Sequence, residues 1–594
     1  MISSLYHRHR KVLNDGQNIS YKSVFLNIIA FLIVNLAVIF VAWGVKAMST
    51  PIEITQNQTI TLLLSDLFFY SLRTLLRMLI AIVISVIVAL PLAVIIAKSA
   101  KVEQILLPML DVLQSVPILG YISFTVTTFL ALFPGQNTGA EMAAIFAIFT
   151  SQVWNIIFSF HQSLKSLPQE LKDTAQVFNL TRWQKFWRME LPFGIPSLVW
   201  NIVLSMSSGW FYVVASEVIV VGNNNITLPG IGSYISLAIA EQNVSAVINA
   251  VVAMTIIILI YDQLIFRPLV VWSDKFRYET TTTDQIPKSW IFELFVKSIL
   301  VSLIVRPILI LVTKIIIYWP HKIAYAINSN NQHPNIASKT PKTINHSSKI
   351  ANYIWYGFLA MSTWITLYYI VNFVNHIVGF KEVLYVMKLG AVTLARVFCM
   401  VLIAAIIWVP IGIKIGLNSH LTKLVQPIAQ FLASFPINIF FPIVVTIIIN
   451  QNLNPDIWLS PLIIIGSQWY ILFNIIAGVS TIPNDLKEVA KNLHVEGYLS
   501  WKKLIIPSII PHFITGAITA SGAAWNASII AEYVVFGHEK ITAYGLGSYI
   551  TEQTIAADFN KIALGVSIMA FYVILLNKLF WQPLNNYSKK KFKF

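Results

Sequence analysis

The chain of 594 residues contains a single cysteine, Cys399, and charged residues make up only 11% of it. One cysteine excludes a disulfide within the chain and a metal site built from several cysteines. Soluble globular proteins carry about 25% charged residues, so the low charge content argues against a soluble protein. The sequence also lacks a Gly-x-x-x-x-Gly-Lys-Ser/Thr phosphate loop and any repeated Ser/His or His/Asp cluster. We therefore expect no metal, no cofactor and no enzymatic activity in this chain.

Hydrophobic residues, by contrast, make up 57% of the chain, and its mean hydropathy is +0.72. Many apolar runs reach the roughly 20 residues that a helix needs to cross a hydrocarbon core of about 30 Å. In the first half we predict spans at 24–45, 72–98, 104–133, 140–164, 195–221 and 246–270. In the second half we predict spans at 352–375, 391–417, 424–450, 457–480, 510–536 and 560–583. The sequence thus predicts an all-α, polytopic protein of the lipid bilayer with about 12 transmembrane helices.

The formal net charge of +16 fits the same interpretation. Lysine and arginine gather at the beginning of the chain, in the middle loops and in the tail at 589–593. Cytoplasmic loops of membrane proteins carry an excess of these residues. We therefore expect both termini in the cytoplasm, and we do not expect a nucleic acid as a partner.

The sequence repeats itself. Gly230 to Ile235 reads Gly-Ile-Gly-Ser-Tyr-Ile, and Gly545 to Ile550 reads Gly-Leu-Gly-Ser-Tyr-Ile, 315 positions later. The same offset joins three upstream pairs, which are Trp210 and Trp525, Glu217 and Glu532, and Gly222 and Gly537. An offset of 319 joins five earlier pairs, which are Thr74 and Thr393, Arg77 and Arg396, Pro91 and Pro410, Pro108 and Pro427, and Pro117 and Pro436. Two registers that each hold over many residues indicate a tandem duplication.

The duplication predicts three regions: a first half at 1–272, a linker at 273–350 and a second half at 351–594. The linker contains one apolar segment, Trp290 to Trp319, that is long enough to cross the membrane. A crossing there would invert the second half and place its basic tail outside, against the distribution of positive charge. We therefore expect an interfacial helix at this segment, and a thirteenth span is the alternative.

The loops between the fourth and fifth spans also match. Asp173-Thr174-Ala175 and Glu488-Val489-Ala490 occupy equivalent places, and each loop closes on a proline, Pro192 or Pro507. Acidic residues suit the first turns of a helix because of its dipole. The spacing predicts short cytoplasmic helices, and their presence in both halves favours the docking of a cytoplasmic partner.

These loops resemble the EAA loop of the permeases of bacterial ABC importers, which reads Glu-Ala-Ala, three residues, Gly, and then about nine residues to a final proline. Asn179 and His494 stand where that loop has glycine. Asn tolerates the left-handed conformation that glycine supplies. His494 tolerates it less well, and Gly497, three residues later, is a second candidate for the turn in this loop.

The repeated residues listed above also resemble the nitrate/taurine/sulfonate branch of these permeases. The resemblance implies a type I importer fold in the bacterial inner membrane, with both permease halves fused in one chain. It further implies two separate ABC ATPase subunits, a periplasmic substrate-binding protein and a small polar solute, for which an anion is one candidate. A self-contained secondary transporter is the alternative, although paired docking loops are not needed in that class.

Charged groups inside spans are candidates for function. Six repeated residues are candidates for lining the pathway: Arg77, Trp210, Glu217, Arg396, Trp525 and Glu532. A glutamate seven residues after a tryptophan shares its helix face, so we expect Glu217 and Glu532 to face the opposite half across the centre. The alternative is an Arg–Glu or Glu–backbone bond that holds the helices of one half together.

Overall fold

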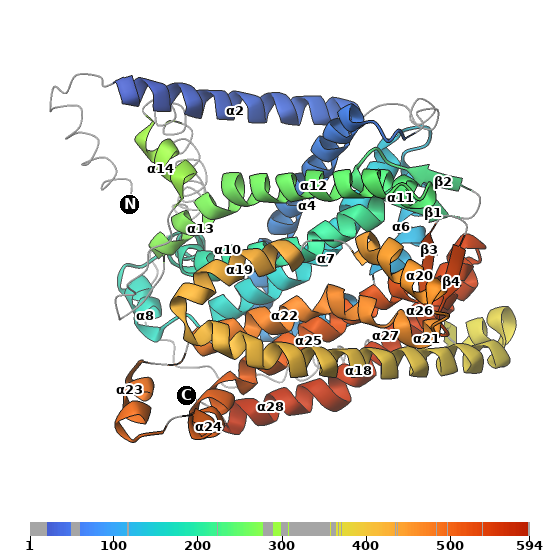
Figure 1. Cartoon of the computed structure of the whole chain (residues 1–594). Helices are drawn as coiled ribbons and strands as arrows, with labels where there is room; N and C mark the ends of the chain where they lie inside the picture. Colours follow the sequence, from blue (N-terminus) through green and yellow to red (C-terminus); the bar gives the residue numbers. More distant parts are fainter. Residues whose placement is uncertain are drawn as a thin grey trace. The chain divides into compact units, whose positions relative to one another are not determined.

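The computed structural model of the chain describes residues 21–48, 60–276, 289–298 and 371–591, apart from short gaps inside these ranges, together with a few single positions between 307 and 369. Figure 1 shows its helices and strands. More than half of the predicted span at 352–375 lies outside the described residues. So does most of the segment Trp290 to Trp319, of which the first part forms helix α14 (Trp290–Lys297). Whether that segment crosses the membrane stays a prediction.

The two sequence repeats fold into the same succession of elements. The first repeat contains α4 (Leu64–Lys98), α5 (Ala100–Ser115), α6 (Ile118–Leu132), α7 (Thr138–Lys165), α8 (Gln169–Val177), α10 (Leu191–Glu217), β1 (Val218–Val221), β2 (Asn224–Thr227), α11 (Ile231–Ala240) and α12 (Val244–Tyr261). The second contains α18 (Phe380–Leu417), α19 (Ser419–Ala433), α20 (Phe441–Asn450), α22 (Pro461–Ser480), α23 (Asn484–Asn492), α25 (Ile506–Ala531), β3 (Tyr533–Phe536), β4 (Glu539–Thr542), α26 (Leu546–Ile555) and α27 (Phe559–Leu576). The duplication seen in the sequence is therefore a duplication of structure.

The chain packs into two compact units that do not coincide with the two repeats. One unit combines residues 1–47, 159–201 and 259–340, and it holds α8 and the beginning of α10. The other combines residues 48–158, 202–258 and 341–594, and it holds most of both repeats. The predicted domain boundaries near 272 and 350 stay a prediction.

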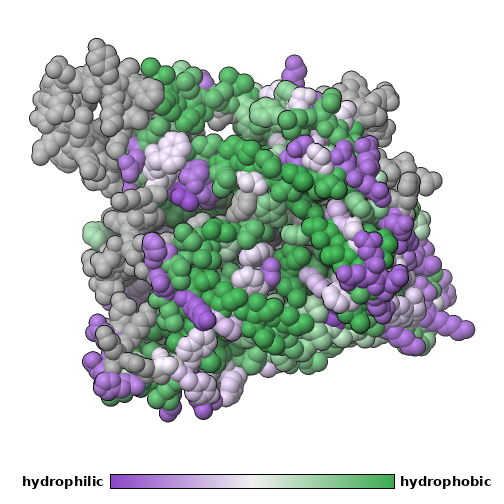
Figure 2. Space-filling model, viewed as in Figure 1, coloured by the Kyte–Doolittle hydropathy of each residue, from purple (hydrophilic) through white to green (hydrophobic). Residues whose placement is uncertain are grey.

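Eight helices among the described residues are long and apolar enough to cross a membrane. In the first repeat these are α4, α7, the segment that ends with α10, and the segment that begins with α12. In the second repeat they are α18 and the segments that contain α22, α25 and α27. The predicted fold class, an all-α polytopic membrane protein, is confirmed. Figure 2 shows hydrophobic residues over these long helices, and hydrophilic residues gather near the strands β3 and β4.

Two of the predicted spans differ from the structure in both repeats. The third span is not one helix: the segment 104–133 forms α5 and α6, and the segment 424–450 forms α19 and α20. In the sequence, a repeated proline, Pro117 or Pro436, stands between the two helices of each pair, and proline lacks the N–H that a continuous helix uses.

The fifth span is also shorter than predicted. Instead of reaching 221 and 536 as helices, the chain leaves α10 and α25 and forms two antiparallel hairpins, β1–β2 and β3–β4. Val218 pairs with Thr227 in the first, and Tyr533 pairs with Thr542 in the second. The strands read Val-Ile-Val-Val and Tyr-Val-Val-Phe, and these β-branched and aromatic residues favour strands.

Close helix packing holds the second repeat together. Figure 1 shows α18, α22 and α25 side by side, and α22 packs extensively against both of the others. Glycines sit at the contacts: a Cβ added at Gly412 would lie 2.8 Å from Ile475, and one added at Gly416 would lie 2.7 Å from Val479. Small residues let membrane helices approach closely, which is the main source of their packing energy in lipid.

Candidate functional site

The carboxylate of Glu217, at the end of α10, is a strongly hydrogen-bonded group of the first repeat. It is fully buried and accepts three hydrogen bonds of 2.6 Å, from Thr74 Oγ1, Arg77 Nη1 and the backbone N–H of Gly232. Gly232 lies in the first turn of α11, whose free N–H groups have no partner inside the helix. The carboxylate satisfies one of them and lies at the positive end of the helix dipole. Glu217 therefore joins α4, α10 and α11.

Thr74 also links the carboxylate of Glu217 to the start of α11. Its hydroxyl donates to Glu217, and its oxygen accepts the backbone N–H of Ile231 at 3.0 Å. The glycines of the motif are required by contact, since a Cβ added at Gly230 would clash with the carboxylate of Glu217 and one added at Gly232 would clash with the carbonyl of Val214. The first glycine of the Gly-x-Gly motif therefore leaves room for the buried glutamate, and the second lets α11 approach the backbone of α10.

The second repeat builds the same arrangement. Glu532 accepts hydrogen bonds from Thr393 at 2.9 Å, from the N–H of Gly547 at 2.6 Å and from Arg396. Thr393 in turn accepts the N–H of Leu546, the first residue of α26, at 2.8 Å. We call the two sets the first and second glutamate clusters: Thr74, Arg77, Glu217 and Gly232, and Thr393, Arg396, Glu532 and Gly547.

The arginines of the two clusters differ in their other bonding partners. Arg77 is fully buried and makes a second, bidentate ion pair with Glu141, at 2.6 and 2.8 Å. Asp456 stands 315 positions after Glu141, but its carboxylate lies 3.9 Å from Arg396 and its side chain is 49% exposed. Arg396 bonds instead to the carbonyls of Asp456 and Tyr544, at 3.2 and 3.3 Å. Arg77 is thus paired closely with two carboxylates, whereas Arg396 is paired closely with one and lies beside the partly exposed Asp456.

That Glu217 and Glu532 face the opposite half stays a prediction. The hydrogen bonds described for each carboxylate all lie within its own repeat, as the alternative interpretation expected. Trp210 and Trp525 are buried as well, at 2% and 1% exposure. A direct role of these residues in a pathway stays a prediction.

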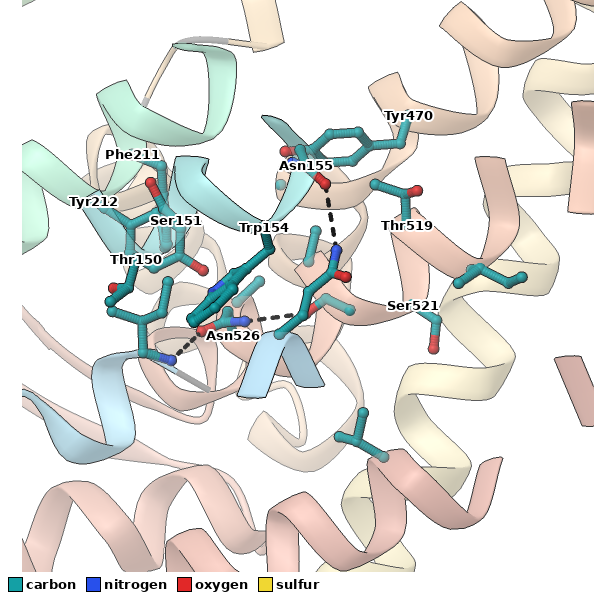
Figure 3. A pocket seen from close by; sticks show the side chains of 18 of the residues that line it. Thr150, Ser151, Trp154, Asn155, Phe211, Tyr212, Tyr470, Thr519, Ser521 and Asn526 are labelled. Atoms are coloured by element: carbon teal, nitrogen blue, oxygen red, sulfur yellow. Dashed lines mark hydrogen bonds between the residues drawn. The ribbon is translucent and has the colours of Figure 1, made fainter. Parts of the chain in front are cut away.

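A cavity of about 180 Å³ lies between the two repeats, and Figure 3 shows its lining. In the first repeat, α7 contributes Thr150, Ser151, Trp154 and Asn155. None of the six residues predicted for the pathway belongs to the described lining. The sequence analysis missed these residues of α7 because they are uncharged and because Thr150, Ser151 and Asn155 do not recur in the second repeat.

The second repeat supplies the opposite wall. Tyr470 comes from α22, and Thr519, Ser521 and Asn526 come from α25. Asn526 joins the two walls, because its Oδ1 accepts the backbone N–H of Ile118, the first residue of α6, at 2.8 Å. The equivalent of Asn526 in the first repeat is Phe211, which has no such acceptor. The cavity is therefore built from residues that differ between the repeats.

The predicted cytoplasmic helices are present as α8 and α23. Both end in the same way, since the N–H of Leu180 donates to the carbonyl of Ala175 at 3.0 Å and the N–H of Val495 donates to that of Ala490 at 2.8 Å. This bond requires a left-handed residue before it, and Asn179 and His494 fill that position with φ of 47° and 50°.

Of the two candidates for this turn, His494 rather than Gly497 takes the position after α23. His494 adopts the left-handed conformation itself, although Gly497 also has a positive φ of 58°. The C-terminal hydrogen bond of α23 fixes the turn at His494, whatever the side chain there. The apolar residue before each turn is exposed to solvent: Phe178 is 71% exposed and Leu493 is 69% exposed.

Comparison with known families agrees with this architecture. Residues 89–267 and 408–581, more than half of the chain, match the model of the family described as "Binding-protein-dependent transport system inner membrane component". The chain belongs to this family and carries its domain twice. The recognition of an ABC importer permease with two fused halves is thereby confirmed.

Individual relatives match one part of the chain each. It is 32% identical over 176 residues to the bicarbonate transport system permease protein CmpB of Synechococcus elongatus, a match that covers 30% of this chain and 60% of that protein. It is 24% identical over 248 residues to the nitrate import permease protein NrtB of Synechocystis, covering 39% of this chain and 85% of that protein. It is 27% identical over 193 residues to the glycine betaine/carnitine transport permease protein GbuB of Listeria monocytogenes, covering 32% and 63%.

We predict that Glu217→Gln and Glu532→Gln each lower the free energy of unfolding by about 3 to 5 kcal/mol, the usual cost of breaking a buried ion pair. Glutamine keeps one acceptor oxygen, whereas each glutamate uses both of its oxygens. Thermal unfolding of the purified chain in detergent measures the effect. Glu552→Gln is the control, because that side chain is 46% exposed. Normal melting of both cluster variants, together with lost transport, would show that the carboxylates serve the pathway instead.

Proposed function

We propose that this chain is the membrane-spanning part of an ATP-driven importer and that the cavity between its repeats belongs to the translocation pathway. The observation that carries the proposal is the cavity itself, whose wall comes from both copies of a permease domain. Membership of the permease family supports it. ATP hydrolysis is assigned to two separate ATPase subunits, and delivery of the solute to a substrate-binding protein on the outer face.

The solute of this proposal is small and polar. The relatives named above are permeases for bicarbonate, nitrate and glycine betaine/carnitine, so both anions and zwitterions are candidates on that ground. We further propose that both termini lie in the cytoplasm of a bacterial cell, as the basic tail suggests.

Accessibility of the cavity to water tests the pathway directly. We expect Thr519→Cys, in a chain whose Cys399 is replaced by serine, to react with a small membrane-impermeant thiol reagent in membrane vesicles. Ile406→Cys is the control, because this residue of α18 is 74% exposed on the apolar surface and should stay unlabelled in lipid. If Thr519→Cys is unlabelled from both sides of the membrane, the cavity is not part of a pathway.

Coupling to the ATPases is assigned to α8 and α23 and to the turns that follow them. The apolar side chains of Phe178 and Leu493 are exposed at equivalent positions, and buried apolar anchors carry most of the energy of protein interfaces. Asp173 and Glu488 are exposed on the same helices, and Asp173 accepts a hydrogen bond from Gln169 at 2.9 Å. These residues supply an apolar anchor and an acidic rim in each half.

We predict that the pair Phe178→Ala and Leu493→Ala weakens binding of the ATPase subunits by about tenfold or more, or about 1.4 kcal/mol. The pair Asp173→Ala and Glu488→Ala should impair solute-stimulated ATP hydrolysis while the chain still inserts. Co-purification and ATPase assays in nanodiscs measure both. Ile457→Ala is the control, since this side chain is 63% exposed but lies in α21 (Pro455–Trp458), away from the coupling helices in sequence. Unchanged binding and hydrolysis in both double variants would place the coupling elsewhere.

A further inference from the structure

The helix α8 is followed by a stretch of basic and aromatic residues. Residues 182–188 read Arg-Trp-Gln-Lys-Phe-Trp-Arg, in α9 (Arg182–Lys185) and the first part of a π-helical turn, η1 (Phe186–Glu190). We call this stretch the first entry segment. It contains no aspartate or glutamate, so its cations give it a net positive charge, in contrast to the acidic rim on α8.

The helix α23 of the second repeat is followed by the same kind of stretch. Residues 497–505 read Gly-Tyr-Leu-Ser-Trp-Lys-Lys-Leu-Ile, in α24 (Gly497–Ser500) and another π-helical turn, η7 (Trp501–Ile505). We call this stretch the second entry segment, and it too lacks acidic residues. Three pairs of similar residues recur at the offset of 315, which are Trp183 and Tyr498, Phe186 and Trp501, and Arg188 and Lys503.

Both entry segments expose cations beside aromatic rings. Tyr498 is 80% exposed and Trp183 is 44% exposed. Arg182, Lys502 and Lys503 are exposed as well, and in the described part of the chain no carboxylate forms an ion pair with them. Their charges are therefore available to an anion from outside the chain.

The entry segments lie at the start of membrane-crossing helices. Each continues without a break into α10 or α25, and the combined helices, Arg182–Glu217 and Gly497–Ala531, have 36 and 35 residues. Roughly 20 residues suffice to cross a hydrocarbon core of about 30 Å, so these helices are long enough to keep their first turns outside it. Trp and Tyr are enriched where a membrane meets water. The entry segments therefore belong at the surface of the bilayer.

The anions at that surface are the headgroups of lipids. Anionic lipids attract lysine and arginine side chains that lie close to the membrane surface. Arginine matches the geometry of a phosphate with its fork of N–H groups, and lysine supplies a compact positive charge. An aromatic ring beside these cations has an apolar body that packs on the lipid chains.

We propose that each entry segment binds the phosphate headgroup of an anionic lipid and thereby holds the preceding turn, at Asn179 or His494, at the membrane surface. The cations contact the phosphate, and the exposed ring contacts the adjoining part of the lipid. A free phosphate carries the same charge but offers the ring nothing to pack against, so the site is assigned to the lipid. This site does not depend on the proposed pathway or on the ATPase subunits.

Native mass spectrometry of the purified chain, titrated with phosphatidylglycerol or phosphatidylcholine in uncharged detergent, tests the proposal. We expect the unaltered chain to retain phosphatidylglycerol at a concentration about tenfold lower than phosphatidylcholine, because only the former is anionic. Arg182→Gln with Lys185→Gln should remove one tightly bound phosphatidylglycerol, and so should Lys502→Gln with Lys503→Gln. All four substitutions together should abolish the preference, whereas Lys502→Arg with Lys503→Arg should retain it.

The matched control is the pair Lys98→Gln and Lys101→Gln. These lysines at the junction of α4 and α5 are exposed, but no aromatic residue lies within five positions of either in the sequence, so lipid retention should stay unchanged. An excess of inorganic phosphate should not displace the lipid.

Four outcomes would overturn the proposal. The first is an unaltered chain that does not distinguish the two lipids, and the second is a variant with all four substitutions that keeps the preference. The third is displacement by inorganic phosphate, which would show a site for free phosphate. The fourth is unchanged lipid retention with lost co-purification of the ATPase subunits, which would show that the entry segments contact protein instead. Solute transport enters none of these measurements, so they leave the proposed pathway to its own test.

Discussion

The fold of each repeat depends on one buried carboxylate. Glu217 and Glu532 each bind an arginine, a threonine and the first turn of the following helix. In a hydrocarbon setting, water cannot satisfy the free N–H groups of a helix end, so a side chain must. Among the repeated residues, the threonines bond to these carboxylates and Gly230 and Gly545 leave room for them. Charge inside the membrane serves here to hold three helices of one repeat in a fixed arrangement.

When two permease domains are fused in one chain, the sequences of the two copies can diverge from each other. The first arginine is sealed between two carboxylates, whereas the second has one close carboxylate and a partly exposed aspartate. The cavity shows the same divergence, with Asn526 facing α6 in one copy and Phe211 standing at its place in the other. Two identical chains around a twofold axis would have to present the same residue twice. The fused chain instead offers the solute two different walls.

Much of this was readable from the sequence, and the failures have physical causes. The repeat registers predicted the duplication, and they marked Arg77, Glu217 and their counterparts because the same contacts were kept twice. The hairpins were missed because Val218–Val221 is as apolar as the helix before Glu217, and the span was continued through that glutamate. The β-branched run followed by Gly222 and Asn223 is nevertheless a strand and turn signal. The cavity was missed because its polar residues are neutral, differ between copies and gain their meaning only when α7 and α25 meet.

The central claim is that each glutamate cluster braces its own repeat independently. Amide hydrogen exchange of residues 228–240 and 543–555 tests it most directly, in the wild-type chain and in the two glutamine variants. The account predicts that Glu217→Gln raises exchange only in the first segment, where Gly232 loses its acceptor. It predicts that Glu532→Gln raises exchange only in the second, at Gly547. Increased exchange in both segments from either single substitution would contradict the account, because it would mean that one shared network holds the two repeats.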